Sequence, residues 1–290
     1  MARRSSAALS WNAYGKSAVR LVKVTRTGER QSLRDLTVSV AFEGEFERVY
    51  TAGDNSPVLP TDTMKNTVYA MASQHPVDPI EDFALTLGRH FLGRNEPVRA
   101  VRIDVDEHGW RRVKVGDRHH PHSFIAGSEE RRVARLRLER DGAELESGVE
   151  DLVLLKTTGS AFEGYLRDEY TTLPETSDRI FATAVSARWR YGADGTKAGS
   201  DYNGFWWAAR QALIEAFAET HSLSVQHTLY AMGERILDVC AQVEEVRLTL
   251  PNKHHLLVNL APFGLENPNE IFVPTREPYG LIQGTVRRKS

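Results

Sequence analysis

Residues 36–42 read Leu36-Thr37-Val38-Ser39-Val40-Ala41-Phe42, so large apolar side chains alternate with small or polar ones. A β-strand with one buried face has this period of two. We expect residues 19–24, which are also rich in apolar side chains, to pair with it as a neighbouring strand. The sequence therefore predicts that the chain opens with paired strands, one side of which needs a covering layer.

The period then changes to that of helices. Residues 64–73 follow Thr61-Asp62 and suit a helix, and Asp78-Pro79 supplies an N-cap and a first-turn proline for a second helix. Apolar side chains of this second helix recur every three or four residues before Gly93, at Ile80, Phe83, Leu87 and Phe91. Strands are expected again at residues 101–105 and 135–138, where apolar and charged side chains alternate.

The second half of the chain repeats this order. We expect a strand at 181–189, helices at 204–220 and 225–239, and strands at 246–250 and 255–260. Each half then reads strand, strand, helix, helix, strand, strand, which predicts an α+β protein with two tandem antiparallel ββααββ units, residues 1–150 and 151–290. Residues 1–12 are expected to be flexible. The tail at 271–282 either wraps a neighbouring subunit or packs on its own unit.

Composition excludes several classes of protein. The chain has 290 residues and a net charge of −2, which gives no uniform electrostatic reason to bind nucleic acid or a membrane surface. The single cysteine, Cys240, rules out an intrachain disulfide and favours a reducing, cytoplasmic location. The N-terminus lacks the apolar run of a secretory signal, no stretch approaches a membrane span, and the ending Arg287-Arg288-Lys289-Ser290 is not a peroxisomal address.

Common catalytic motifs are missing from the sequence. It contains no phosphate-binding loop, dinucleotide fingerprint, Gly-x-Ser-x-Gly elbow or His-Glu-x-x-His pair. The cluster His119-His120-Pro121-His122 invites a metal interpretation, but we favour a polar turn before Phe124, because three histidines this close around a proline rarely converge on one ion without a further ligand. His254 and His255 begin a strand, so their side chains are expected on opposite faces.

Other candidate residues have ordinary explanations when each is taken alone. Thr61 or Asp62 before a helix caps free amide groups. Lys16 fits a solvated surface lysine, and Arg179 fits a salt bridge at the edge of a strand. Arg135 and Arg137 are interpreted as a solvated strand face.

Read together, these segments resemble the urate oxidase (uricase) family over nearly the whole chain. The resemblance is carried, in order, by Tyr14-Gly15-Lys16, Thr61-Asp62-Thr63-Met64-Lys65-Asn66-Thr67, His122-Ser123-Phe124, residues 162–173 (Phe-Glu-Gly-Tyr-Leu-Arg-Asp-Glu-Tyr-Thr-Thr-Leu), Asp178-Arg179, Ser224-Val225-Gln226 and Leu250-Pro251-Asn252-Lys253-His254. It implies the tunnelling fold (T-fold), in which subunits close β-barrels around a tunnel, and a homotetramer with active sites at subunit interfaces.

The resemblance also implies roles for single residues. Phe162 would stack on a purine, Arg179 and Gln226 would hold its polar edge, and the backbone N–H of Val225 would add a donor. Thr61, Asp62 and Asn252 complete the substrate-binding set. Lys16, Thr61 and His254 are the catalytic candidates. The resemblance places Lys16 and Thr61 on one subunit, and on its neighbour it places Phe162, Arg179, Val225, Gln226, Asn252 and His254.

The implied reaction converts urate, O2 and water to 5-hydroxyisourate and hydrogen peroxide without a metal or cofactor, O2 being a co-substrate. A Lys16–Thr61 relay would deprotonate urate, and the resulting dianion would react with O2 directly. Glu163, which follows Phe162, and the absent peroxisomal tail point to a bacterial type. Two alternatives remain: a non-catalytic purine-binding scaffold, and a metalloenzyme that uses His119, His120 and His122. Roles for His227 and His255 stay open.

Overall fold

The chain folds into two compact units. The computed structural model describes residues 7–196 and 199–289, and the units comprise Met1–Ser147 and Gly148–Ser290. Residues 7–13 have no regular secondary structure. The remaining part of the segment expected to be flexible, residues 1–6, lies outside the described residues. The same antiparallel arrangement of strands and helices recurs in each unit, so each is described separately.

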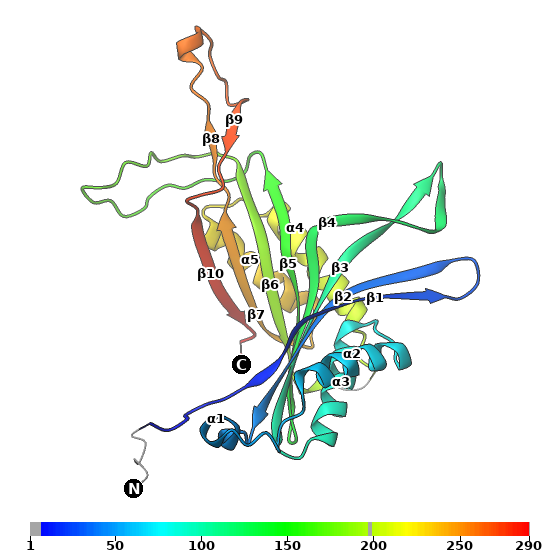
Figure 1. Cartoon of the computed structure of the whole chain (residues 1–290). Helices are drawn as coiled ribbons and strands as arrows, with labels where there is room; N and C mark the ends of the chain where they lie inside the picture. Colours follow the sequence, from blue (N-terminus) through cyan, green and yellow to red (C-terminus); the bar gives the residue numbers. More distant parts are fainter. Residues whose placement is uncertain (1–6, 197–198, 290) are drawn as a thin grey trace. The chain divides into compact units, whose positions relative to one another are not determined.

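The first unit is an antiparallel sheet with two long helices packed on it (Figure 1). Its strands, β1 (Tyr14–Arg26), β2 (Gln31–Gly44), β3 (Val98–Val115) and β4 (Arg118–Glu139), are neighbours in that order. Between β2 and β3 the chain forms α1 (Glu47–Ala52), α2 (Thr61–Gln74) and α3 (Ile80–Arg94). Val19 pairs with Val38 and Val24 with Leu33, which confirms the predicted pairing of the first strands.

The core of this unit lies between the sheet and the helices. Leu36, Val38 and Phe42 of β2 have no exposed surface. The side chains of α3 spaced by three and four residues are buried as well, and the Phe91 ring meets the Phe42 ring with centroids 5.2 Å apart: Ile80, Phe83, Leu87 and Phe91. Burial of each such side chain contributes about 1.5–3 kcal/mol, so this contact fixes the helix on the sheet.

Both long helices of the first unit begin differently from the prediction. Pro79, not Asp78, is the N-cap residue of α3 and gives no side-chain cap. The carboxylate of Asp78 instead contacts Arg34, which also binds Glu107 at 2.6 Å. Likewise Pro60 is the N-cap residue of α2. Thr61 and Asp62 are already helical, so neither is a cap, and the Asp62 carboxylate instead accepts from Lys65 and, at 3.2 Å, from the Asn66 amide.

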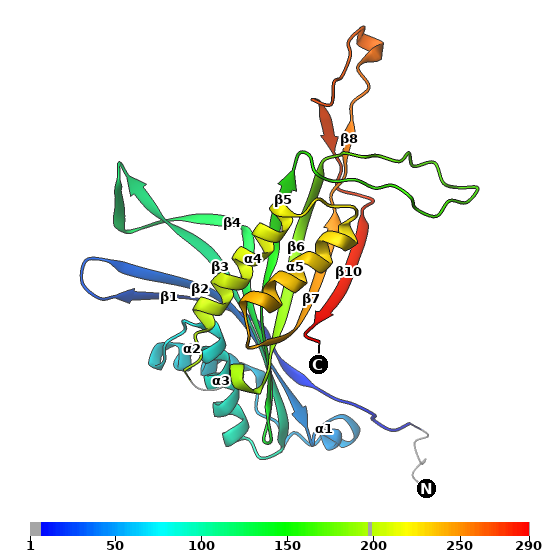
Figure 2. The same cartoon turned by 180° about the vertical axis from the view of Figure 1, so that it is seen from behind.

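The second unit has a similar sheet, β5 (Ala143–Lys156), β6 (Phe181–Tyr191), β7 (Val243–Asn252) and β10 (Gly280–Arg287) in spatial order, with β5 beginning in the last residues of the first unit. Helices α4 (Tyr202–Glu219) and α5 (Val225–Val239) lie side by side on one face of this sheet (Figure 2). The short helices η1 (Ala193–Thr196) and η2 (Ala261–Phe263) lie in connections.

The predicted final strand at 255–260 is wrong in both its length and its partner. Residues His255–Leu257 form β8, which pairs with β9 (Phe272–Pro274) in a separate ribbon that projects from the sheet (Figure 1). The place beside β7 is taken by β10, with Gly280 opposite Asn252. The end of the tail therefore packs on its own unit. Local alternation could not reveal this, because the pairing partner is chosen by tertiary contacts.

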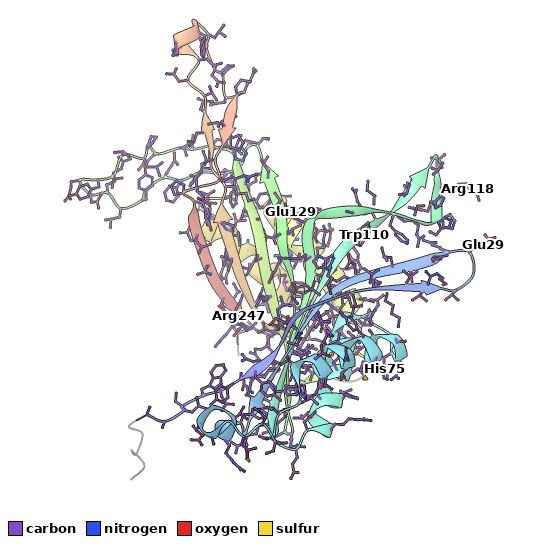
Figure 3. The ribbon with its side chains drawn as sticks, in the orientation of Figure 1. Glu29, His75, Trp110, Arg118, Glu129 and Arg247 are labelled. Carbon is purple, nitrogen blue, oxygen red and sulfur yellow. The ribbon has the colours of Figure 1, made fainter. Side chains whose placement is uncertain are left out.

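A shared anchor supports the duplicated order. In the first unit Lys23 on β1 donates to the carbonyls of Ala72 and His75 at the C-terminal end of α2, at 2.7 and 2.8 Å (Figure 3 labels His75). In the second unit Lys156 on β5 donates to the Thr220 carbonyl at 2.6 Å, at the end of α4. A lysine at a helix C-terminus satisfies carbonyls without intrahelical partners and complements the helix dipole.

Two other predictions fail. His119, His120 and His122 lie inside β4, not in a turn, and Lys114 of β3 pairs with His119. The turn is at Gly116 and Asp117, beside Arg118 at the tip of the hairpin (Figure 3). The side chain of Arg135 is only 18% exposed and binds Asp106 at 2.7 Å, so the Arg135/Arg137 face is an ion-pair network more than a solvated surface.

None of the helices in the described residues has the length and apolar character needed to cross a bilayer.

Candidate active site

The loop at 157–180, between β5 and β6, brings Phe162 and Arg179 together. The Phe162 N–H donates to the Thr176 carbonyl at 2.8 Å, and the Thr176 N–H returns a bond to Phe162 at 3.2 Å. The Arg179 N–H donates to the Ser160 carbonyl at 2.8 Å. These bonds align two segments that we call the Phe162 limb (residues 158–162) and the Arg179 limb (residues 176–179).

Arg179 is a half-buried cation that no carboxylate of the described residues neutralises. Its guanidinium carbon lies 5.2 Å from the centroid of the Phe162 ring. Burial alone lowers the pKa of Arg179, and no carboxylate in the part of the chain that the structure describes forms an ion pair with it. The salt bridge considered for this residue is therefore wrong. A guanidinium with unused donors beside an aromatic face can bind a flat anion.

Phe162 itself is held by a second aromatic ring. The Tyr165 ring stacks on it with centroids 4.7 Å apart and planes within 13°. The Tyr165 hydroxyl donates to the Leu173 carbonyl, and the Arg167 guanidinium lies 5.2 Å from the Tyr165 ring centroid. The plane of Phe162 is thus fixed by its own loop before any ligand binds.

The start of α5 is tied to the same limb. The Ser222 N–H donates to the Gly159 carbonyl at 2.9 Å, and the Ala161 N–H donates to the Ser222 carbonyl at 2.7 Å. Ser224 then caps α5 by accepting from the His227 N–H at 3.1 Å. The next two residues are the predicted binding residues Val225, which is buried, and Gln226, which is exposed. Their position in the first helical turn presents N–H groups that lack intrahelical partners and favour an anion.

Asn252 and His254 lie at the end of β7. Asn252 is opposite Thr183 of β6 and has the parity of the buried residues Leu248 and Leu250, so its side chain is on the face that carries the helices. The His254 carbonyl accepts from the Thr275 N–H at 2.9 Å. Both side chains are half-buried. Hydrogen bonds and ring contacts join Phe162, Arg179 and the start of α5, but among the described residues none joins Asn252 or His254 to them.

The remaining predicted residues belong to the first unit. Lys16 is on β1 opposite Val40, and Thr61 and Asp62 begin α2. The hydrogen bond from Lys65 holds the pKa of Asp62 below its ordinary value, and the charges of Lys65 and then Lys16 add to this effect. Thr61 is half-buried and lines an apolar pocket with Leu59. Lys16, Thr61 and Asp62 thus form a second group, separate in sequence from the first.

The side chains of His119, His120 and His122 belong to β4. The described residues contain no group of three His, Cys, Asp or Glu side chains placed to hold a metal ion. The His120 and His122 rings meet edge to face, with centroids 4.5 Å apart. Sequence reasoning quoted Tyr165 and Asp178 within the resembling segments but gave neither a role, although both shape the loop around Phe162 and Arg179. Asp178 binds residues about twenty positions away in an irregular loop, so no local pattern marks it.

Comparisons with known proteins agree along the chain. The family model described as Uricase matches residues 12–137 and 145–283. The uricase of the bacterium Arthrobacter globiformis is 44% identical over 281 residues, which cover 97% of this chain and 90% of that protein. The uricase of Aspergillus flavus is 41% identical over 290 residues, covering 96% of each.

Solved structures extend the likeness to the fold. A crystal structure of the Arthrobacter globiformis uricase matches with a TM-score of 0.92 and covers 98% of this chain and 96% of that chain. A Bacillus sp. TB-90 urate oxidase matches with a TM-score of 0.84 at 27% identity, covering 96% of this chain and 100% of that chain.

Proposed function

The chain belongs to the uricase family, and from this premise we propose that it oxidises urate with molecular oxygen. The observation that carries the proposal is the uncompensated guanidinium of Arg179 beside the Phe162 ring. Urate at neutral pH is a flat, oxygen-rich anion. Its ring can stack on Phe162, and its negative charge can compensate the charge of Arg179.

Binding follows from the chemistry of the loop and of α5. The purine stacks on Phe162, whose ring is backed by Tyr165. The rigid fork of Arg179 donates to the anionic edge. Gln226 offers one donor and one acceptor to a ring that presents both, and the N–H of Val225 donates from the start of the helix. Asn252 lies over the ring where oxygen or water reacts.

Deprotonation is assigned to the other group of residues. Lys16 acts as the base through the Thr61 hydroxyl, which can accept and donate a proton in turn, and His254 assists. Asp62 binds substrate beside Thr61. The contribution of Lys16 to the field at Asp62 supports this grouping.

The dianion that results is electron-rich enough to reduce O2 directly. One electron passes to O2, the radical pair combines to a peroxide at the purine, and the peroxide leaves as H2O2. Water addition completes the balance of urate, O2 and H2O against 5-hydroxyisourate and H2O2. In this proposal the protein supplies orientation, proton transfer and exclusion of water, and neither metal nor cofactor takes part.

We further propose that the chain forms a homotetramer of the tunnelling fold with active sites at subunit interfaces. Lys16, Thr61 and Asp62 come from one subunit, and Phe162, Arg179, Val225, Gln226, Asn252 and His254 from its neighbour. Two features support this: the two groups belong to different compact units, and β1 and β10 are edge strands with an unpaired side. The cytoplasmic location suggested by the single cysteine is part of the same proposal.

The test is an assay of the purified protein. We expect the near-ultraviolet absorbance of urate to disappear with one O2 consumed and one H2O2 released per urate, and the rate to persist after chelation. Urate binding without turnover would instead identify a purine-binding scaffold, and loss of activity that returns on addition of one metal would identify a metalloenzyme.

A further inference from the structure

Asp178 precedes Arg179 in sequence but does not neutralise it. One of its carboxylate oxygens, Oδ1, accepts from the backbone N–H of Gly159 at 2.8 Å and of Ser160 at 3.3 Å. The other, Oδ2, accepts from the Thr158 hydroxyl at 2.6 Å. Both oxygens are therefore engaged by the Phe162 limb, although an unpaired guanidinium begins at the next residue.

These bonds close the gap between the two limbs. The carboxylate of Asp178 reaches from the Arg179 limb to residues 158–160, and the Arg179 N–H donates back to the Ser160 carbonyl. The Asp178 carbonyl also accepts from the Thr176 hydroxyl at 2.9 Å, within the Arg179 limb. The Asp178 side chain thus adds three hydrogen bonds to the backbone bonds that align the segments carrying Phe162 and Arg179.

The choice of partners has an electrostatic consequence. An aspartate free to pair with the neighbouring arginine would occupy the fork that a ligand anion needs, because carboxylates bind guanidinium groups through the same donors. Three donors on the other limb keep this carboxylate engaged. The hydrogen bond from Thr158 in particular holds the pKa of Asp178 below its ordinary value, which agrees with a carboxylate that is stabilised as an anion.

We propose that Asp178 is a positioning residue for purine binding, which clamps the Arg179 limb to the Phe162 limb and withholds its own charge from the Arg179 guanidinium. This inference rests on the proposed function, because it assumes that Arg179 and Phe162 bind urate. It assigns Asp178 to substrate affinity and to no step in proton transfer or oxygen chemistry.

Asp178→Asn tests the clamp with little change of shape. The carboxamide of asparagine keeps one oxygen acceptor but carries no charge. Its NH2 group also faces donors that an oxygen of Asp178 accepts from. We expect the KM for urate to rise about tenfold while kcat changes less than about threefold, which is the signature of lost ground-state binding. Anaerobic titration with urate, in which no turnover occurs, is expected to show the same loss of affinity. Unchanged affinity in both measurements would overturn the proposal.

A matched control is available in the same loop. Asp168 also accepts from a backbone N–H, that of Tyr170 at 3.0 Å, and from a hydroxyl, that of Thr171 at 2.8 Å. It does not join the two limbs. Asp168→Asn is therefore expected to leave the KM within about twofold of the unsubstituted enzyme. An equal rise of the KM in both variants would assign the effect to general loosening of the loop and would contradict the clamp.

A double-mutant cycle separates the clamp from an independent structural effect. If Asp178 acts through Arg179, then Asp178→Asn adds no further loss of urate affinity to Arg179→Ala, whereas independent effects multiply. Multiplicative losses would refute the inference while leaving the urate site intact. If Arg179→Ala alone leaves affinity unchanged, the proposed site itself fails. Should Asp178→Asn not fold, Thr158→Val removes one donor only and is expected to raise the KM about threefold.

Discussion

The guanidinium carbon of Arg179 lies 5.2 Å from the centroid of the Phe162 ring, and no carboxylate within the described part of the chain compensates its charge. Burying a charged arginine without a counter-charge costs solvation free energy, and for the same reason burial lowers the pKa of Arg179. The site is thus prepared for an anion that fits against an aromatic ring.

The first prediction concerns this pair. Arg179→Ala removes a charged donor of the substrate anion, which corresponds to about 1.5–3 kcal/mol, or about 10- to 150-fold in urate affinity. Arg179→Lys keeps the charge but loses the fork and is expected to recover only part of the loss. Steady-state kinetics and anaerobic titration measure both. Full recovery by lysine would show that charge alone, without fork geometry, binds the substrate.

The second prediction concerns proton transfer. Lys16→Ala is expected to lower kcat by about 100-fold or more, with little change in the KM, because a general base typically contributes this much to the rate. Stopped-flow spectra under anaerobic conditions would show whether urate still binds. A variant that binds urate weakly but turns over at the normal rate would contradict the role given to Lys16.

The third prediction concerns the sharing of sites between subunits. Lys16→Ala and Arg179→Ala chains are each expected to be nearly inactive. Reassembly from a mixture should restore activity, because some sites then combine an intact Lys16 from one chain with an intact Arg179 from another. Random association of equal amounts restores about one quarter of the sites. Mixtures that stay inactive after exchange, verified by mass spectrometry of the assemblies, would place each complete site within one chain.

The fourth prediction concerns stability and pH. Glu81 on α3 is fully buried and accepts from Arg132 at 2.6 Å, while the Ser147 hydroxyl donates to its other oxygen. Burial raises the pKa of Glu81. Arg132→Met leaves this carboxyl without its cation and is expected to cost about 3–5 kcal/mol in the free energy of unfolding at neutral pH. The double variant Glu81→Leu with Arg132→Met should lose much less.

The sign of the pH dependence follows from the raised pKa. A carboxyl that holds its proton more tightly in the folded state favours folding at low pH and loses that contribution as pH rises from its unfolded to its folded pKa. Arg132→Met raises the folded pKa further, so its stability deficit should shrink on acidification. Urea unfolding at several pH values measures this, and a deficit that grows below the unfolded pKa of glutamate would exclude the explanation.

Helices with a clear apolar stripe were predictable from sequence. The bounds expected for the last helix, 225–239, coincide with α5, because Ser224 caps it and its stripe faces the sheet. The start of α3 was displaced by one residue, and the Asp78 carboxylate contacts Arg34 instead of capping the helix. Strand partners were harder. β10 replaced residues 255–260 beside β7, and only contacts across the unit decide such a pairing.

The site was recovered to a different degree in its different parts. Phe162 and Arg179 entered through resemblance, and their contact in the structure supports that assignment. Sequence patterns assigned no role to Tyr165 or Asp178, the residues that hold Phe162 and Arg179 in place. Asp178 and Tyr165 act through bonds to backbone atoms of an irregular loop, and backbone partners leave no periodicity in the side chains. In the proposed homotetramer the two site groups meet only on assembly, so a pattern within one chain does not reveal their joint placement.

The lysine anchors at Lys23 and Lys156 have a consequence for how such a protein diversifies. Each half carries its own fastening between strand and helix, so neither depends on the other for that part of its construction. Duplicated modules that are built independently are free to specialise. In the proposed function the first half supplies Lys16 and Thr61, and the second half supplies the loop with Phe162 and Arg179, so the two halves contribute different groups to the site. Substitutions that change the site residues of one half can then accumulate without disturbing the strand-to-helix anchor of the other half.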